Sequence, residues 1–507
     1  MSTALLRGAV VFTQDQTAAT AVAVQDDRIV FVGDDDQAAA YHGADTVLDL
    51  GGALVAPAFV DAHVHTVASG FLLTQLDLRS ADSLDDALDL LAAYAGDRAL
   101  VVGSGWDETR WPERRPPTSA ELDRAAGGAR VFLDRVDGHS SVLSSAMVEA
   151  VPGLPGIDGY DASGRVERHA RHAVSATLAG LVGPDERLCA ARTAVAAMAA
   201  VGVAGFHENA APHIGPEYEL DLVRMAASEA GLLVTCYWGE ALDPDAAQRL
   251  GVAGLAGDLN ADGAIGSRTA ALRQEYADRP GHLGNAYLEV AQIADHVERC
   301  TRAGIQAGFH CIGDAGLDAV TGGFRLAEQR LGRPALAAAG HRLEHVEMPS
   351  SETIAMMADL QVTASMQPRF DALWGGPGQM YAARLGQRWR GMNPFAELVR
   401  AGVPLAFGSD SPVTEVSPWS AVRAAVTHHE ESQRLDPATA FRAHTWGGWR
   451  AARQDGGVLV AGAPAQLAVW DCPGPLTADG LPTLEDDELP RLQRLLVAGR
   501  TVLEEGT

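Results

Sequence analysis

Basic residues and long apolar runs are both scarce in this sequence, and each shortage excludes a class of protein. The 39 Lys and Arg residues are outnumbered by 66 Asp and Glu, which gives a net charge of −27 at pH 7. We therefore expect no nucleic-acid partner and no anionic membrane surface, because phosphates are bound through clustered basic side chains. No stretch reaches the apolar length of a membrane span. The charge mainly favours solubility.

Cysteine is also rare, and its placement argues against a disulfide framework. The five cysteines are odd in number and never form a C-x-x-C pair, which is typical of reduced thiols in a cytoplasmic protein. Residues 1–11 lack the basic start and apolar run of a signal peptide. A cytoplasmic location is the expectation. The cysteines are Cys189, Cys236, Cys300, Cys311 and Cys472.

The middle of the chain alternates strand-like apolar runs with stretches of helical spacing. A chain of 507 residues is too long for one ordinary domain unless that domain is a large α/β barrel. Repeated strand–helix units predict parallel strands with right-handed crossovers, and about eight units favour a closed (β/α)8 barrel. The predicted strands include 54–60, 201–206, 232–238, 304–309, 341–345, 362–366 and 404–407; the predicted helices include 84–94, 220–230, 286–303, 315–329, 350–360 and 393–400.

Both ends of the chain carry only short strand-like segments. Each set is too small to be stable alone, so we expect one small β-sandwich built from both termini. The stretch from about 99 to 188 is irregular and turn-rich, and we interpret it as an insertion that shapes or covers the pocket. The expected domains are 1–56 and 451–507 for the sandwich, and 57–450 for the barrel with its insertion.

His63 and His65 are separated by one residue at the end of the first predicted barrel strand. Side chains at i and i+2 of a strand point to the same side, so both imidazoles can reach one ion. Imidazole is a good ligand for Zn and similar ions. Two surface or hydrogen-bonded histidines are the alternative. The position favours a metal site, because barrel enzymes place their chemistry at the C-terminal ends of the strands.

Three further residues of ligand type have the same placement: His310, His345 and Asp410 each end a predicted strand. A single histidine or aspartate at such a position is more often structural. Several on different strands of one barrel predict a shared metal centre, because the strand ends meet at one mouth.

Eight segments together resemble one known family. They are APAFVDAHVH, DGHSSVLSS, NADGAIGSRTAAL, GFHCIGDAGLDAV, HRLEHVE, ASMQPRF, PLAFGSDSPV and GGVLVAGAPAQLAVWD, in order between residues 56 and 471. The chain resembles the amidohydrolase superfamily, in particular family three, the branch that contains N-substituted formamide deformylase. The resemblance covers nearly the whole chain.

The resemblance implies a fold and a ligand set. The barrel is flanked by a small sandwich, and His63 and His65 ligate a metal. His310 and His345 match the histidines of the fifth and sixth strands. Asp410 matches the aspartate of the eighth strand, which binds metal and handles the proton of the attacking water.

One departure from the family concerns the number of ions. Many relatives carry a Lys before the DG motif that can bridge two metals, whereas this chain has Asp258 there. Glu208 is another strand-end acid that can substitute as a ligand. The family also has an acidic residue at the end of a G-x-x-x-E segment. In this chain Arg168 occupies that position, and the nearest acid, Glu167, lies one residue earlier. We expect one divalent ion, Zn first, in preference to two.

The expected mechanism follows from such a centre. A Zn-class ion lowers the pKa of bound water from roughly 15.7 to about 7. Asp410 would take the water's proton and pass it to the leaving nitrogen, with His345 as a second electrophile. His139 is expected to line the pocket from the insertion. Arg268 is expected to bind a substrate carboxylate, with a structural salt bridge as the alternative.

The predicted function is hydrolysis of a non-peptide C–N bond in a small-molecule substrate of amide, N-acyl or formamide type. A deaminase or an esterase on the same metal centre is one alternative, since one fold hosts many chemistries. A catalytically silent binding protein is another. A homodimer is expected from the family alone.

Overall fold

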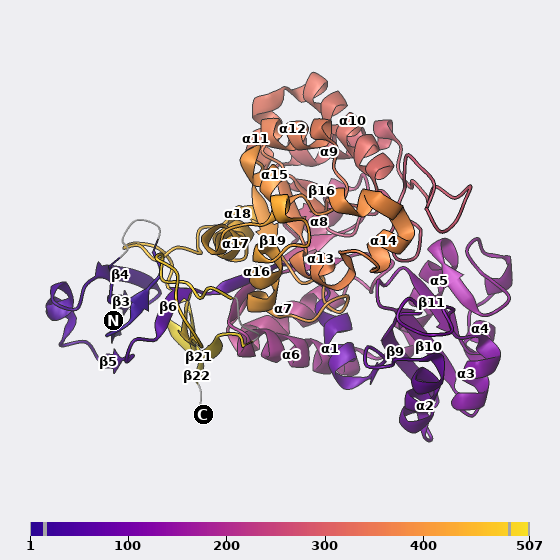
Figure 1. The fold of residues 1–507 in the computed structure, drawn as a ribbon, viewed down its shortest axis with the longest axis horizontal. Helices are drawn as coiled ribbons and strands as arrows, with labels where there is room; N and C mark the ends of the chain where they lie inside the picture. The colour runs from indigo at the N-terminus through magenta and orange to yellow at the C-terminus, as the bar shows by residue number, and fades with distance from the viewer. Residues whose placement is uncertain (1, 14–17, 485–487, 505–507) are drawn as a thin grey trace.

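The computed structural model describes residues 2–13, 18–484 and 488–504. Three parts follow one another along its longest axis (Figure 1): the terminal sheets beside the N-terminus, a central barrel with its helices, and an insertion at the opposite end. The insertion and the terminal sheets therefore lie on different sides of the barrel.

The central sheet has eight parallel strands in the order β19-β18-β17-β16-β15-β14-β13-β7. It closes between its first and last strands, because the Asp410 N–H donates to the His63 carbonyl at 2.8 Å and Val64 bridges Ser411. The (β/α)8 fold is thereby confirmed. The strands are β7 (Phe59–Val64), β13 (Val203–Ala210), β14 (Leu233–Trp238), β15 (Gly254–Leu255), β16 (Gln306–Cys311), β17 (Arg342–His345), β18 (Thr363–Met366) and β19 (Leu405–Phe407).

The segment predicted as one strand over 54–60 is two strands. β6 (Leu54–Pro57) pairs in a terminal sheet, and β7 begins at Phe59. Pro57 has no N–H to donate and ends the first ladder. The barrel strand consequently runs further than predicted, so that His63 lies within β7 and His65 directly after it.

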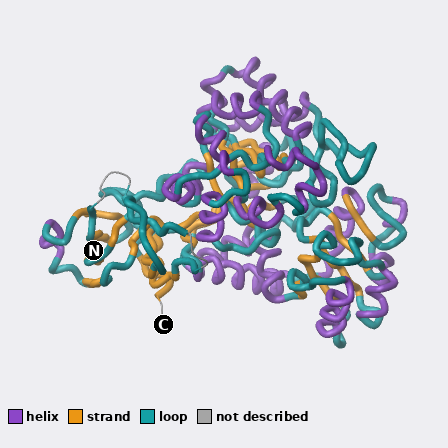
Figure 2. The backbone as a smooth tube through the Cα atoms, in the orientation of Figure 1, coloured by secondary structure: helices purple, strands orange, loops and turns teal. Residues whose placement is uncertain are grey.

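Helices surround the barrel strands (Figure 2). The predicted helix over 286–303 begins four residues late, because the Glu289 N–H donates to the side chain of Gln292 and forms the N-terminal cap. The helices are α1 (Thr66–Thr74), α6 (Pro184–Ala200), α7 (Glu219–Ala230), α8 (Pro244–Leu250), α9 (Val290–Ala303), α10 (Asp314–Leu331), α11 (Arg333–Ala339), α12 (Ser351–Leu360), α13 (Pro368–Trp374), α14 (Met380–Leu385), α15 (Phe395–Arg400), α16 (Pro418–Val426), α17 (Pro437–Ala443) and α18 (Trp446–Ala451), with short 3-10 turns η3 (Gly386–Gly391) and η4 (Glu431–Gln433).

Both ends of the chain form the terminal sheets, as predicted. A four-stranded sheet, β4-β3-β1-β5, and a five-stranded sheet, β2-β6-β20-β21-β22, share an apolar core that includes Val22, Val55 and Leu467. The remaining elements are β1 (Thr3–Arg7), β2 (Val10–Val11), β3 (Ala21–Gln25), β4 (Arg28–Gly33), η1 (Gln37–Tyr41), β5 (Thr46–Asp49), β20 (Leu467–Asp471), β21 (Arg491–Val497) and β22 (Arg500–Glu504).

The insertion has a sheet of its own, in the order β12-β11-β10-β9-β8. It spans residues 76–181, so it begins earlier than the predicted residue 99. The helix over 84–94 belongs to it, since Leu84 and Leu91 pack with Trp106 and Leu133. Its elements are β8 (Leu76–Asp77), α2 (Leu84–Ala95), β9 (Leu100–Trp106), α3 (Ser119–Ala125), β10 (Arg130–Arg135), β11 (Ser140–Leu143), α4 (Ser145–Ala150), η2 (Leu154–Gly156), β12 (Arg165–Glu167) and α5 (Arg168–Leu181).

Among the helices of the described residues, none combines the length and the apolar character needed to cross a bilayer.

Candidate metal centre

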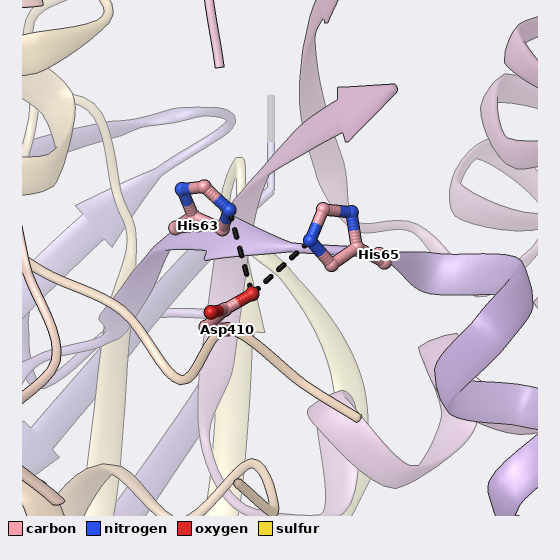
Figure 3. Close-up of side chains that lie close together, drawn as sticks. All are labelled: His63, His65 and Asp410. Atoms are coloured by element: carbon pink, nitrogen blue, oxygen red, sulfur yellow. Dashed lines mark ion pairs between the residues drawn. The ribbon is translucent and has the colours of Figure 1, made fainter. Parts of the chain in front are cut away.

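His63, His65 and Asp410 converge at the barrel mouth (Figure 3). Oδ1 of Asp410 lies 3.1 Å from Nε2 of His65 and 3.5 Å from Nε2 of His63. The donor atoms of the three side chains all lie within 4.8 Å of one another. Groups nearly 350 positions apart in sequence therefore face one point, because β19 closes the barrel against β7.

Asp258 and His345 complete a second group with His63, and its donor atoms also lie within 4.8 Å of one another. Oδ1 of Asp258 is 3.4 Å from Nε2 of His63, and Oδ2 is 3.2 Å from Nε2 of His65. Asp258 is thus in contact with both predicted histidine ligands.

The charges of this cluster depend on one another. Burial is the largest single effect and would lower the pKa of His63, but the carboxylates of Asp410, Asp258 and Glu344 together raise the pKa. The pKa of His65 is raised well above its usual value, also against burial, and mainly by Asp258. Burial would raise the pKa of both aspartates, yet the histidines hold the pKa of Asp410 low and that of Asp258 lower still.

The donor set fits a divalent cation. Nε2 of His63, Nε2 of His345 and Oδ1 of Asp258 are buried without a hydrogen-bond partner. Such atoms cost free energy unless something satisfies them. Imidazole nitrogens and carboxylate oxygens arranged around one point are the ligands that Zn and similar ions prefer in proteins.

A second layer of side chains orients the histidines. Nδ1 of His63 donates to Oε2 of Glu344 at 2.9 Å, and Arg342 holds the same carboxylate through bonds of 2.6 and 2.9 Å. Nδ1 of His345 donates to Oε1 of Gln367 at 2.9 Å. Each bond places the proton on Nδ1 and leaves Nε2 free to face the cluster. Glu344 and Gln367 are missing from the predicted site. Arg342 and Glu344 lie two residues apart on one face of a buried strand, and this pairing of opposite charges in the sequence could have indicated Glu344.

Two of the predicted ligands have strained backbones. His345 has φ 70° and Asp410 has φ 54°, both in the left-handed region. Such a conformation costs on the order of 1–3 kcal/mol in a non-glycine residue and is concentrated at functional sites.

His310 lies beside the cluster. Its ring centroid is 4.4 Å from that of His345, and its Nδ1 is 4.0 Å from Oδ1 of Asp262. Burial lowers its pKa to about 4. It belongs to neither of the two groups of converging donor atoms among the described residues. Its role as a ligand stays a prediction.

Glu208, the other acid considered as a ligand, is engaged elsewhere. Its Oε2 accepts the backbone N–H of Thr66 at 2.9 Å, which ties β13 to the start of α1. It is buried but lies outside both groups of converging donor atoms among the described residues. The geometry therefore favours Asp258 over Glu208 as the additional acid.

The sequence predicts that both His139 and Arg268 contact the substrate, but in the structure only His139 of the two lines the cavity at the metal centre. His139 reaches from the insertion to the centre, where its ring centroid is 5.1 Å from that of His310, and it lines a cavity of about 220 Å³ with the ligand cluster. Arg268 donates to both oxygens of Asp278, at 3.1 and 2.8 Å, and does not line this cavity. Its guanidinium is used in the structural salt bridge that was the alternative interpretation.

Comparisons with known proteins agree with this geometry. The Amidohydrolase family profile matches residues 46–503. The putative amidohydrolase YtcJ of Bacillus subtilis is 26% identical over 471 residues, covering 86% of this chain and 85% of that protein. N-substituted formamide deformylase of Arthrobacter pascens is 29% identical over 141 residues, which is 27% of this chain and 26% of that enzyme.

A solved structure with the same fold is an uncharacterized metal-dependent hydrolase from Pyrococcus horikoshii OT3. It superposes with a TM-score of 0.74 at 22% identity, covering 94% of this chain and 99% of that one. The family profile spans about nine tenths of the chain and covers the whole barrel and the insertion, together with β5, β6, β20, β21 and most of β22 of the terminal sheets. The chain belongs to the amidohydrolase family.

Proposed function

We propose that this protein is a metal-dependent hydrolase of a non-peptide C–N bond of amide, N-acyl or formamide type. The observation that carries the proposal is the pair of converging groups, His63 with His65 and Asp410 and His63 with Asp258 and His345, whose buried donor atoms on His63, Asp258 and His345 have no hydrogen-bond partner. Membership of the amidohydrolase family supports hydrolysis, and the partial similarity to a formamide deformylase supports the bond type.

The cofactor that fits best is one Zn ion, held by His63, His65 and Asp410 with Asp258 and His345 close by. A single ion is favoured because Asp258 stands at the position where the resemblance to the family implies a lysine that can bridge two metals. When bound, such an ion supplies an acidified water and polarises a carbonyl oxygen.

Asp410 is the proton carrier in this proposal. The pKa of its carboxyl is held low, so it is ionised at neutral pH and able to accept the proton of the attacking water. The same carboxyl then delivers the proton to the leaving nitrogen. His345 suits a ligand role better than that of a second electrophile, since Nδ1 donates to Gln367 and leaves only a lone pair on Nε2.

The test is Asp410→Asn, compared with Asp471→Asn on the exposed end of β20. We expect Asp410→Asn to keep most of the bound metal and to lose turnover of a short N-alkylformamide by about 10²–10⁴-fold, the usual contribution of a general acid–base group. Metal content by elemental analysis is measured in parallel. Full activity with intact metal would remove Asp410 from this role.

The other functions considered are outcomes of one substrate panel. N-acyl amines, aryl esters and amino-heterocycles are offered to the metal-loaded protein, with release of amine, phenol or ammonia as the readout. A protein that binds no metal and turns over none of them is a silent binding protein. The small-molecule substrate, the cytoplasmic location and the homodimer stay predictions.

A further inference from the structure

We propose that the substrate carries an extended, uncharged apolar substituent, which lies in a channel between α1 and the sheet of the insertion. This inference rests on the proposed function and specifies the substrate class of the same site. It is carried by the composition of the cavity that leads away from the metal centre.

The cavity of about 220 Å³ begins at the metal centre, where His65, Asp258, His345 and Asp410 form part of its wall. From there it continues between the barrel and the insertion. A substrate whose C–N bond lies at the ligand cluster can therefore extend a large substituent into this space.

Six apolar side chains form one part of the wall away from the centre, beside polar residues such as Gln75, Ser104 and Ser175. We call this part the apolar channel and define it by Phe71 and Leu72 of α1, Leu76 of β8, Val102 of β9, Phe132 of β10 and Leu178 of α5. Leu72, Leu76 and Phe132 are almost fully buried. Each methylene group moved from water into such surroundings strengthens binding about fourfold.

The arginines of the cavity wall, Arg168, Arg171 and Arg187, each have a carboxylate partner, which for Arg187 is Glu219, although Nε of Arg168 is buried without a hydrogen-bond partner. Arg171 binds both oxygens of Asp134, at 3.1 and 2.7 Å, and Arg168 donates to Asp158 at 2.9 Å. A carboxylate on the substrate would have to compete with these partners. The arrangement therefore favours an uncharged substituent over an anionic one.

A second, smaller compartment of about 30 Å³ lies on the other side of the centre. His139, His310, His345 and Asp410 border both compartments, so the reacting group sits between a large space and a small one. The small compartment has room for about two water-sized groups. The inferred substrate is accordingly an asymmetric amide with one short and one long side. The small compartment is also lined by Phe370, Trp374 and Tyr381.

The test is a chain-length series of N-alkylformamides from ethyl to octyl, measured as binding by calorimetry and as kcat/KM. We expect affinity to rise about fourfold per methylene until the channel is filled. Leu72→Trp should shorten the longest chain accepted by several carbons. Leu73→Trp is the matched control, because the next residue of α1 is 54% exposed and does not line the channel. A parallel series of N-methylalkanamides shows whether the long substituent is on the acyl side or on the nitrogen side of the amide.

Phe132→Ala gives a second measurement should Leu72→Trp fail to fold, and it should extend the accepted length. Affinity that stays flat along both series, or the same shortening in Leu72→Trp and Leu73→Trp, would overturn the channel. The two proposals fail separately. Length-dependent binding without hydrolysis contradicts the proposed function, whereas hydrolysis of short and long amides alike contradicts the channel.

Discussion

His63 is surrounded by three carboxylates: Glu344 at Nδ1, and Asp258 and Asp410 near Nε2. The side chain is fully buried, so its position is set by these contacts and not by solvent. Glu344 fixes the ring and its proton, and the two aspartates share the space in front of Nε2. At the scale of single residues, the centre is an excess of buried negative charge that a divalent cation would neutralise.

Replacing Asp258 tests how much of that charge holds the metal. Asp258→Asn keeps the shape of the side chain and removes one carboxylate that touches both His63 and His65. We expect metal affinity to fall by at least about tenfold, measured by competition with a chromogenic chelator. Glu208→Gln is the control and should lose less, because that carboxylate is bonded to the Thr66 N–H. Equal losses would remove Asp258 from the centre.

The candidate ligands can be recognised in the sequence more readily than the side chains that support them. His63, His345 and Asp410 are predicted because a strand end is visible as the point where an apolar run stops, and the structure places each of them in a group of converging donor atoms. Glu344 and Gln367 escape, since their contacts with histidines on neighbouring strands depend on how the barrel aligns its strands. A local sequence pattern does not predict which residues of two neighbouring strands lie side by side.

At the scale of elements, the insertion is joined to the barrel by buried ion pairs. Arg135 of β10 binds Asp107, Glu108 and Asp137 at 3.0, 2.9 and 2.7 Å. Glu108 also accepts from Arg384 of α14, at 3.2 Å. Asp137 in turn accepts the His139 N–H at 3.2 Å. One arginine thus connects the sheet of the insertion, a barrel helix and a histidine beside the metal centre.

Arg135→Met tests this connection. The change leaves the buried Asp107 and Asp137 without their cation and Glu108 with Arg384 alone, and a broken buried pair costs about 3–5 kcal/mol. We expect a lower unfolding midpoint and faster proteolysis within residues 76–181. Arg115→Met removes an exposed pair with Glu121 and should cost about 0–1 kcal/mol. The same effect from both variants would show that the buried arginine does not secure the insertion.

Element boundaries show where periodicity is informative. The helices expected over 220–230 and 350–360 are present almost as predicted, because an apolar stripe repeats along each. The insertion starts before its predicted boundary, because α2 has the same kind of stripe but packs against β9 and β10. The apolar periodicity of a helix predicts that one of its faces is buried, but it does not predict which sheet covers that face.

At the scale of the whole molecule, the fold class follows from the order of the segments. The interpretation of the insertion as a segment that shapes the pocket also comes from the sequence, and Phe132 and His139 of the insertion line the cavity. The barrel wall also depends on buried histidines that anchor helices and loops to strands. His296 of α9 donates to the Leu255 carbonyl at 3.0 Å and accepts the Leu242 N–H at 3.1 Å. Two other buried histidines make the same kind of contact with strands. His341 accepts the Ala307 N–H at 2.9 Å, and His444 donates to the Val60 carbonyl at 2.9 Å.

These histidines make the stability of the barrel depend on pH. Burial lowers the pKa of His296 and His444 to about 4 and that of His341 to about 3. An unfolded chain binds a proton at each of them below its ordinary pKa of about 6.5, whereas the folded chain does not. The free energy of unfolding therefore falls as the pH drops from about 6.5 to about 4, by about 1.4 kcal/mol per pH unit for each histidine.

His296→Gln retains a donor and an acceptor but does not titrate, so its unfolding midpoint should decline less between pH 7.5 and pH 5 than that of the unchanged protein. His42→Gln, at an exposed position, should follow the unchanged protein. If the decline is the same in all three, the acid sensitivity of the fold comes from other groups than these anchors.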